Sequence, residues 1–316
     1  MDRQRCIYHN QTENQIVKKN LRYFSILDRL NSMFLLIMLV IYFFSLPFTP
    51  YKLGPLLVFA LSAVSVWMSV YLRKKNLTTG IAKFFRLAYP LIYLFVIFES
   101  FFMILPFINP NRYDELLSNI DFSMFGVHPT VWIEQWNRAW LTDFFYLLYV
   151  FYFPMPLFIL AWLYKQKRFV DLDKSIWIYM LTYYGAYLGY FLVPAAGPRF
   201  YEPLMKLQQT GLDGLFLARP VRTIINFLEP NKLDAFPSLH AAISFTTLML
   251  MGKYNKKMFW IFLPIISGIM ISLVYCRYHY VIDMIAGIGW SVTTFVFGQL
   301  IYNKFAKGKT VPFYQT

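Results

Sequence analysis

The sequence predicts an all-α protein, a polytopic bundle of about eight transmembrane helices. Of its 316 residues, 58% are hydrophobic and 21% are aromatic, while only 15% are charged, against roughly a quarter in soluble domains. Apolar runs recur along the chain, and most are close to the ~20 residues that a helix needs to cross ~30 Å of hydrocarbon. Basic residues gather between these runs. Together these features indicate an integral membrane protein.

The predicted spans follow the apolar runs in chain order. They lie at about 32–48, 54–72, 87–108, 141–163, 175–195, 236–252, 258–275 and 282–302. The first 31 residues are polar and basic, and they lack the apolar segment and small-residue cleavage site of a signal peptide. We therefore expect cytoplasmic tails at 1–31 and at 303–316.

The net charge of +14 is concentrated in the tails and in the loops near 73–86, 165–174 and 253–257. Such loops face the cytoplasm under the positive-inside rule. A nucleic-acid partner would need basic residues on a soluble face beside stacking or groove-reading elements, so we expect none. Cys6 and Cys276 fall on opposite sides of the membrane in this topology, and neither a disulfide nor a cysteine metal site is indicated.

Three polar motifs interrupt the apolar C-terminal half of the chain. They are Gly-Pro-Arg at 197–199, Phe-Pro-Ser-Leu-His-Ala-Ala at 236–242 and Tyr-His-Tyr-Val-Ile-Asp at 278–283. In the predicted topology all three fall on the extracytoplasmic face. Segments that are distant in sequence but meet on one membrane surface are what a composite site requires.

The third motif contains the candidate nucleophile. His279 and Asp283 are one helical turn apart and can share a face. The carboxylate can then hold one imidazole nitrogen and make the other more nucleophilic. An ionisable residue within a membrane segment is costly and indicates function by default. In the second motif, Pro237 at a helix start would present free backbone N–H groups to an anion beside Ser238 and His240.

Each of these residues also has a structural interpretation, which stays open from the sequence alone. The histidines can be hydrogen-bonded structural groups, Arg199 can be a snorkelling interfacial cation, and Ser238 can simply begin a helix. A zinc site of two histidines and an aspartate is a further alternative, although the motifs supply no additional His or Cys ligand.

Two other segments invite interpretation. In the non-spanning stretch 109–140, Trp132, Trp136 and Trp140 recur every four residues, which predicts one face of a helix lying in the headgroup layer. The alternative is an ordinary interfacial belt of tryptophans or a cap on the bundle. Residues 196–235 form a long loop that either gates headgroup access or only connects two spans.

The three motifs, with Ser272–Gly287 around the third, resemble the phosphate-binding motifs of the type 2 phosphatidic-acid phosphatase superfamily. They are most similar to its inositol-phosphorylceramide-synthase-like branch. The resemblance implies a catalytic helical core at 141–302, and the N-terminal transmembrane helices and interfacial segment predicted at 32–140 precede it. It implies His279 as the nucleophile that forms a phosphohistidine, Asp283 as its orienting partner and His240 as the acid for the leaving oxygen. It also implies Arg199 and Ser238 as phosphate ligands, and the chemistry needs no metal or other cofactor.

The chain departs from the common phosphatase pattern at two cationic positions. Leu192 and Leu273 stand where that pattern has a lysine and an arginine. Arg277 is the expected replacement as a phosphate ligand, with Lys206 and Lys232 as further candidates. A phosphodiester carries less charge than a phosphomonoester dianion, so a thinner set of cations favours a diester donor.

We therefore expect a membrane lipid phosphotransferase with its active site on the extracytoplasmic side. It would move a phospho-headgroup, for instance phosphoinositol, from a phospholipid to a lipid alcohol such as ceramide. One alternative is a phosphatase that hydrolyses a lipid phosphomonoester. A second is a non-enzymatic lipid binder or translocator that uses the same anion pocket. The membrane and a phospholipid or lipid phosphate are the expected partners.

Overall fold

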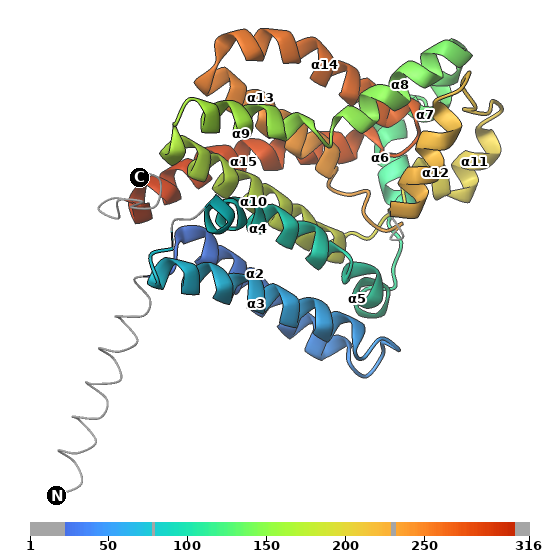
Figure 1. Ribbon diagram of the computed structural model, residues 1–316. Coiled ribbons are helices and arrows are strands. Elements are labelled where there is room, and N and C mark those ends of the chain that lie inside the picture. The colour runs from blue at the N-terminus through green and yellow to red at the C-terminus, as the bar shows by residue number, and fades with distance from the viewer. Residues whose placement is uncertain (1–22, 78–79, 229–231, 307–316) are drawn as a thin grey trace, which may run out of the picture.

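The structure, a computed structural model, describes residues 23–77, 80–228 and 232–306 of the chain. These residues form a bundle of helices (Figure 1), with an isolated β-bridge between Ala195 and Asp234. The predicted all-α class is confirmed. Most of the two predicted tails lies outside the described residues.

The N-terminal part packs along one side of the bundle (Figure 1). Its helices are α2 (Ile26–Ser45), α3 (Gly54–Lys74), α4 (Gly80–Phe98) and α5 (Phe101–Ile108). Buried polar groups join this part to α10 (Phe169–Leu192): Tyr184 donates to Asn31 Oδ1 at 2.8 Å, and Tyr187 donates to the Leu94 carbonyl oxygen at 3.3 Å. Hydrogen bonds of this kind hold helices together where lipid supplies no hydrophobic driving force.

The C-terminal part surrounds a central helix, α13 (Leu239–Tyr254), which contacts four neighbours. These are α9 (Met155–Lys165), α10, α14 (Lys256–Tyr275) and α15 (Val281–Ala306). α8 (Ala139–Phe151) packs on α14 and meets α9 at a 44° bend. α13 and α15 approach closely, because a Cβ at Gly287 would lie 2.4 Å from the Ser238 carbonyl oxygen.

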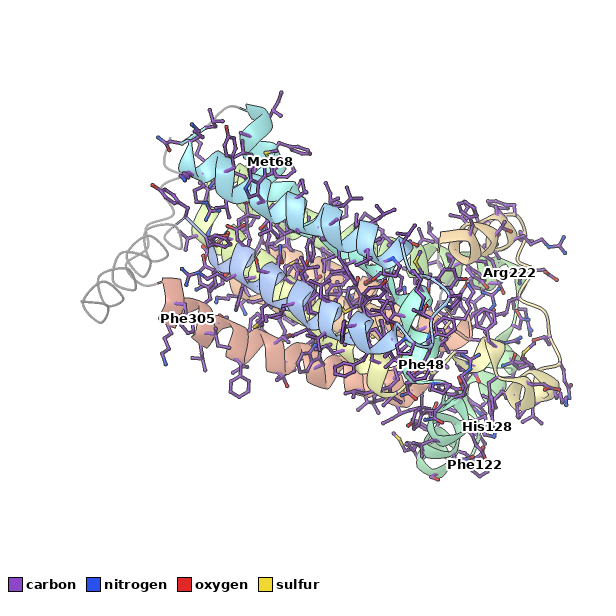
Figure 2. All side chains as sticks on the ribbon, turned by 90° about the horizontal axis from the view of Figure 1, so that it is seen from below. Phe48, Met68, Phe122, His128, Arg222 and Phe305 are labelled. Carbon is purple, nitrogen blue, oxygen red and sulfur yellow. The ribbon has the colours of Figure 1, made fainter. Side chains whose placement is uncertain are left out.

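Short helices gather at one end of the bundle (Figure 1). They are α6 (Asp114–Phe125), α7 (Pro129–Trp132), η1 (Ile133–Trp136), η2 (Pro198–Phe200), α11 (Glu202–Leu207) and α12 (Ala218–Leu228). Figure 2 shows Phe122, His128 and Arg222 at this end, with Met68 and Phe305 at the opposite one. The chain therefore has a structured cap at one end of the bundle only, among its described residues.

The prediction of a single helix through the three tryptophans is wrong. α7 ends at Trp132, η1 ends at Trp136, and Trp140 belongs to α8. Asn137 interrupts the helical path in an extended conformation, and its amide donates to the Gly211 carbonyl oxygen at 2.9 Å. All three indoles are nevertheless exposed.

The connection at 196–235 is not structureless, because it contains η2, α11 and α12. Asp143 of α8 accepts hydrogen bonds from the four consecutive amides of residues 215–218, at 2.8–3.1 Å. A carboxylate at a helix start satisfies amides that the helix itself cannot. This contact fixes α12 against α8.

The predicted count of eight spans is not confirmed. Five of the described helices are long and apolar enough to cross a membrane, or six if the bent pair α8–α9 forms one span. α13 has only 16 residues. α10 is long enough, but polar residues such as Tyr179 and Tyr184 interrupt its apolar sequence. Their hydroxyl groups form hydrogen bonds with Thr247 and Asn31 of neighbouring helices.

Candidate active site

The second and third motifs meet at a pair of histidines. His240 is the second residue of α13, and His279 lies in the short segment between α14 and α15. His279 Nε2 lies 3.3 Å from His240 Nδ1, although the two residues are 39 positions apart. His279 is almost fully buried. The structure thus brings together the two residues that the sequence predicts as nucleophile and acid.

The backbone fixes the tautomer of His279. Its Nδ1 lies 3.0 Å from the carbonyl oxygen of Ala235, which can only accept a hydrogen bond, so Nδ1 carries the proton. In the neutral ring Nε2 then keeps its lone pair, and His240 Nδ1 can donate to it. An imidazole held in this way is a positioned nucleophile.

Asp283 lies beside this ring in a different way from the one predicted. α15 begins only at Val281, so His279 precedes the helix, and Asp283 Oδ2 lies 3.5 Å from His279 Nδ1. The same oxygen accepts a hydrogen bond from the Tyr280 amide at 2.8 Å. Asp283 therefore holds the segment that carries His279, while the carbonyl of Ala235 holds the ring.

A second carboxylate, Asp234, faces the nucleophile. The side chain is half-buried, and burial raises its pKa to about 6, with His279 acting in the opposite direction. Burial lowers the pKa of His279 to about 4, and the charge of Asp234 partly offsets that effect. His279 is therefore neutral at neutral pH, as a nucleophile must be. From the sequence alone, Asp234 is only one of several charged residues in the connection at 196–235, and nothing marks it as part of the site.

The first motif reaches the site through Tyr278. The Arg199 amide donates to the Arg277 carbonyl oxygen at 2.9 Å, and its guanidinium donates to the Tyr278 hydroxyl and lies 5.0 Å above that ring. Gly197 makes this approach possible, because it has φ +86° and a Cβ there would lie 2.3 Å from the Tyr278 carbonyl oxygen. Arg199 thus contacts the residue that precedes His279.

Ser238 caps α13. It is fully buried, and its Oγ accepts a hydrogen bond from the Ala241 amide at 3.2 Å. The first amides of the helix, on Leu239 and His240, are those that a helix end offers to an anion. A phosphate at this end would therefore meet backbone donors, while the Ser238 oxygen serves the helix cap.

The candidate replacement cations differ in location. The Arg277 guanidinium donates to Glu134 of η1 and, at 2.8 Å, to the Thr210 carbonyl oxygen. Lys206 pairs with Glu202 at 2.7 Å on the exposed helix α11. Lys232, in contrast, lines the same cavity as both histidines.

That cavity has a volume of about 470 Å³. One side is polar and contains His240, His279, Asp234 and Lys232. The remaining wall is largely apolar and aromatic, and it is built by α4, α8, α10 and α12. Its residues include Phe95, Phe98, Tyr149, Tyr152, Phe153, Tyr183, Tyr187, Tyr190, Val221, Ile224 and Ile225. A polar end beside an aromatic chamber suits an amphipathic ligand.

A family profile described as the PAP2 superfamily matches residues 115–297, which is more than half of the chain. The chain belongs to the PAP2 superfamily. The resemblance inferred from the three motifs is thereby confirmed. Together with the apolar helices, PAP2 membership supports a multi-pass membrane protein and an enzyme of this superfamily.

Two curated PAP2 relatives illustrate the similarity. Phosphoinositol dihydroceramide synthase of Bacteroides thetaiotaomicron is 27% identical over 201 residues, covering 57% of this chain and 65% of that protein. A PA-phosphatase related-family protein of Dictyostelium discoideum is 26% identical over 141 residues, covering 42% of this chain and 25% of that protein. The chain therefore spans less than two thirds of either relative. No solved structure matches significantly.

The PAP2 match begins inside α6, a helix whose aspartates bind two of the motif segments. Asp114 accepts hydrogen bonds from the amides of Ala196 and Gly197 at 2.9–3.0 Å, beside the first motif. Asp121 accepts from the amides of Val281 and Ile282 at 2.8 and 2.9 Å, at the start of α15. α6 therefore clamps the first motif to the third.

Neither aspartate was predicted from the sequence. The tryptophans dominate the pattern of residues 109–140, which therefore indicated an interfacial segment. The available signal was the spacing of Asp114 and Asp121, which are seven residues apart and so lie on one face of a helix. Their buried position distinguishes them from ordinary surface charges.

Proposed function

We propose that this PAP2 protein is a lipid phosphotransferase that works through a phosphohistidine on His279. The contact that carries the proposal is His279 Nε2 at 3.3 Å from His240 Nδ1, with the other nitrogen of His279 held by a backbone carbonyl. In-line displacement at phosphorus requires a nucleophile, a proton for the leaving alkoxide and donors around the phosphate oxygens. The two histidines and Lys232, which line the cavity together, support the proposal.

In the first step, His279 Nε2 forms a bond to phosphorus and the bond between phosphorus and the diacylglycerol oxygen breaks. His240 gives its proton to that oxygen. In the second step, the hydroxyl oxygen of the acceptor attacks phosphorus, the phosphorus–nitrogen bond breaks, and His240 takes the hydroxyl proton. Arg199, Lys232 and the first amides of α13 would hold the phosphate oxygens, and no metal ion is required.

The proposed substrates are a phosphoinositol-bearing phospholipid as donor and a ceramide-type alcohol as acceptor. Two observations favour a diester donor. The Bacteroides relative is a phosphoinositol dihydroceramide synthase, and the ion pair of Arg277 with Glu134 leaves fewer cations near the histidines. The second candidate is hydrolysis of a lipid phosphomonoester. It is favoured by the name of the Dictyostelium relative and by Lys232 in the cavity.

Purified protein supplied with phosphatidylinositol and dihydroceramide, or with phosphatidic acid alone, separates the candidates. We expect diacylglycerol and a phosphoinositol-bearing ceramide from the first mixture. Rapid monoester hydrolysis without diester turnover would exclude the transferase. If vanadate inhibits neither reaction and no phosphate is trapped on histidine with any donor, a non-enzymatic binder or translocator is favoured.

Substitution of the two histidines tests their roles. His279→Ala should reduce turnover to background, and His240→Ala should reduce kcat by about 10²–10⁴-fold, the usual contribution of a general acid. His128→Gln is the matched control, because His128 lies outside the cavity and contacts Ser118 and Phe122. Full activity of His279→Ala would exclude the phosphohistidine.

A further inference from the structure

The cavity extends beyond the PAP2 region into the N-terminal part of the chain. Phe95, Phe98 and Glu99 line it from the end of α4, before the matched segment 115–297 begins. Phe98 stacks on Tyr187 of α10 with ring centroids 5.4 Å apart, so this wall is packed against the core. The N-terminal helices therefore help to form the substrate chamber itself.

Glu99 is the one carboxylate on the N-terminal side of this chamber, among the residues that the structure describes. It follows α4 directly, and its amide still donates to the Phe95 carbonyl oxygen at 3.3 Å. The phosphotransfer chemistry described above gives Glu99 no role. Its side chain is exposed, so it stands at an open part of the cavity that an incoming ligand can reach.

The charge of Glu99 restricts what it can bind. It would repel a phosphate, but it accepts hydrogen bonds from neutral hydroxyl and amide groups. Its neighbour Phe98 stacks on Tyr187, and Tyr187 lines the same cavity as Asp234 and both histidines. Glu99 therefore shares one chamber with the polar end of the cavity.

We propose that Glu99 binds the hydroxyl or amide N–H groups of the neutral lipid alcohol that accepts the phospho group, and so selects the acceptor. The inference rests on the proposed transferase function. The alcohol would enter along the aromatic wall with its apolar chains toward Phe95 and Phe98. Its reacting hydroxyl would then face His279.

Glu99→Gln and Glu99→Ala, assayed in liposomes with phosphatidylinositol and dihydroceramide, test the proposal. The readout is the ratio of alcohol product to water product, together with the KM of each lipid. A hydrogen bond to a charged group contributes about 1.5–3 kcal/mol, so the KM of dihydroceramide should rise at least about tenfold and the transfer-to-hydrolysis ratio should fall. Glu202→Gln on exposed α11 is the matched control and should behave like the unmodified protein.

The outcomes are distinct from those that test the transferase itself. An unchanged KM for dihydroceramide and an unchanged ratio in both Glu99 variants would overturn the assignment of Glu99. A change confined to the KM of phosphatidylinositol would overturn it as well, because it would place the donor headgroup at Glu99. If the unmodified protein cleaves no donor, the transferase proposal fails first, and the role of Glu99 fails with it.

Discussion

The ring of His279 is held from two directions. Ala235 accepts from Nδ1, and the neighbouring Asp234 supplies a negative charge. In the proposed reaction the ring becomes more positive as Nε2 bonds to phosphorus, so a nearby carboxylate stabilises the transition state. At the scale of single residues, the reactivity of the site therefore depends on Asp234 as well as on Asp283.

The pH profile tests this role. His279 has a pKa near 4 and is lost as a nucleophile only as pH falls through that value, whereas Asp234 gains a proton as pH falls through about 6. We expect kcat/KM to decline in two steps on acidification, and Asp234→Asn should remove the step near pH 6 while lowering kcat/KM at pH 7 by roughly tenfold. The measurement is kcat/KM against pH for both proteins. An unchanged profile would exclude an electrostatic role for Asp234.

The two loop lysines form a second comparison at this scale. Lys232→Ala should lower kcat/KM for the donor by roughly tenfold, because a charged donor to the phosphate is lost. Lys206→Ala should leave it unchanged, since Lys206 pairs with Glu202 away from the cavity. Steady-state kinetics on both variants decide the matter. Equal effects would show that Lys232 acts only through the overall surface charge.

At the scale of elements, α6 organises the site without touching the substrate cavity. Its two aspartates bind backbone amides of the first and third motifs. Two of these amides lie in the loop before η2, and the other two begin α15, where the helix itself supplies no acceptor. Buried amides need partners. The motif loops keep their shape because a separate helix supplies those acceptors.

Replacing Asp121 measures this contribution. Asp121→Ala leaves the amides of Val281 and Ile282 without their acceptor, and each such loss costs about 1–3 kcal/mol. We expect a lower Tm in detergent and a fall in kcat. Ser123→Ala on the exposed face of the same helix is the control. A variant with unaltered Tm would mean that water replaces the carboxylate.

The same elements show what the sequence could predict. The three motifs and the histidine pair were predictable, because each polar cluster stands out within an apolar half-chain. The Ala235 carbonyl was not predictable, since a backbone acceptor has no residue signature. The different roles of the cations were not predictable either. The sequence indicates Arg277 as a phosphate ligand, whereas in the structure it binds Glu134, which is 143 positions away. The span count was not confirmed, because α10 and α13 are too polar or too short for the usual pattern of a span.

At the scale of the whole molecule, the two ends of the bundle differ in charge and structure. The structured cap with Arg222 and His128 lies at one end, and Met68 and Phe305 lie at the other (Figure 2). The last turn of α3, after Met68, contains Arg73 and Lys74, and the last turn of α15 contains Lys304 next to Phe305. The positive-inside rule places that second end in the cytoplasm, so we propose that the active site faces the other side.

Single cysteines report this orientation. Gln209→Cys lies beside the capped end and Lys165→Cys lies at the end of α9, both on exposed positions. In a background with Cys6 and Cys276 replaced by serine, a membrane-impermeant maleimide should label Gln209→Cys on intact cells. It should label Lys165→Cys only after permeabilisation. The reverse pattern would invert the topology.

The shared chamber between α4 and the PAP2 core has an evolutionary consequence. We propose that chemistry and choice of alcohol reside in separate stretches of one polypeptide, which meet at contacts such as that between Phe98 and Tyr187. Exchanging the leading helices between homologous chains would then redirect which molecule is modified without disturbing how phosphorus is handled. Diversification of bacterial or eukaryotic lipid products by such exchange would require no new catalytic residue.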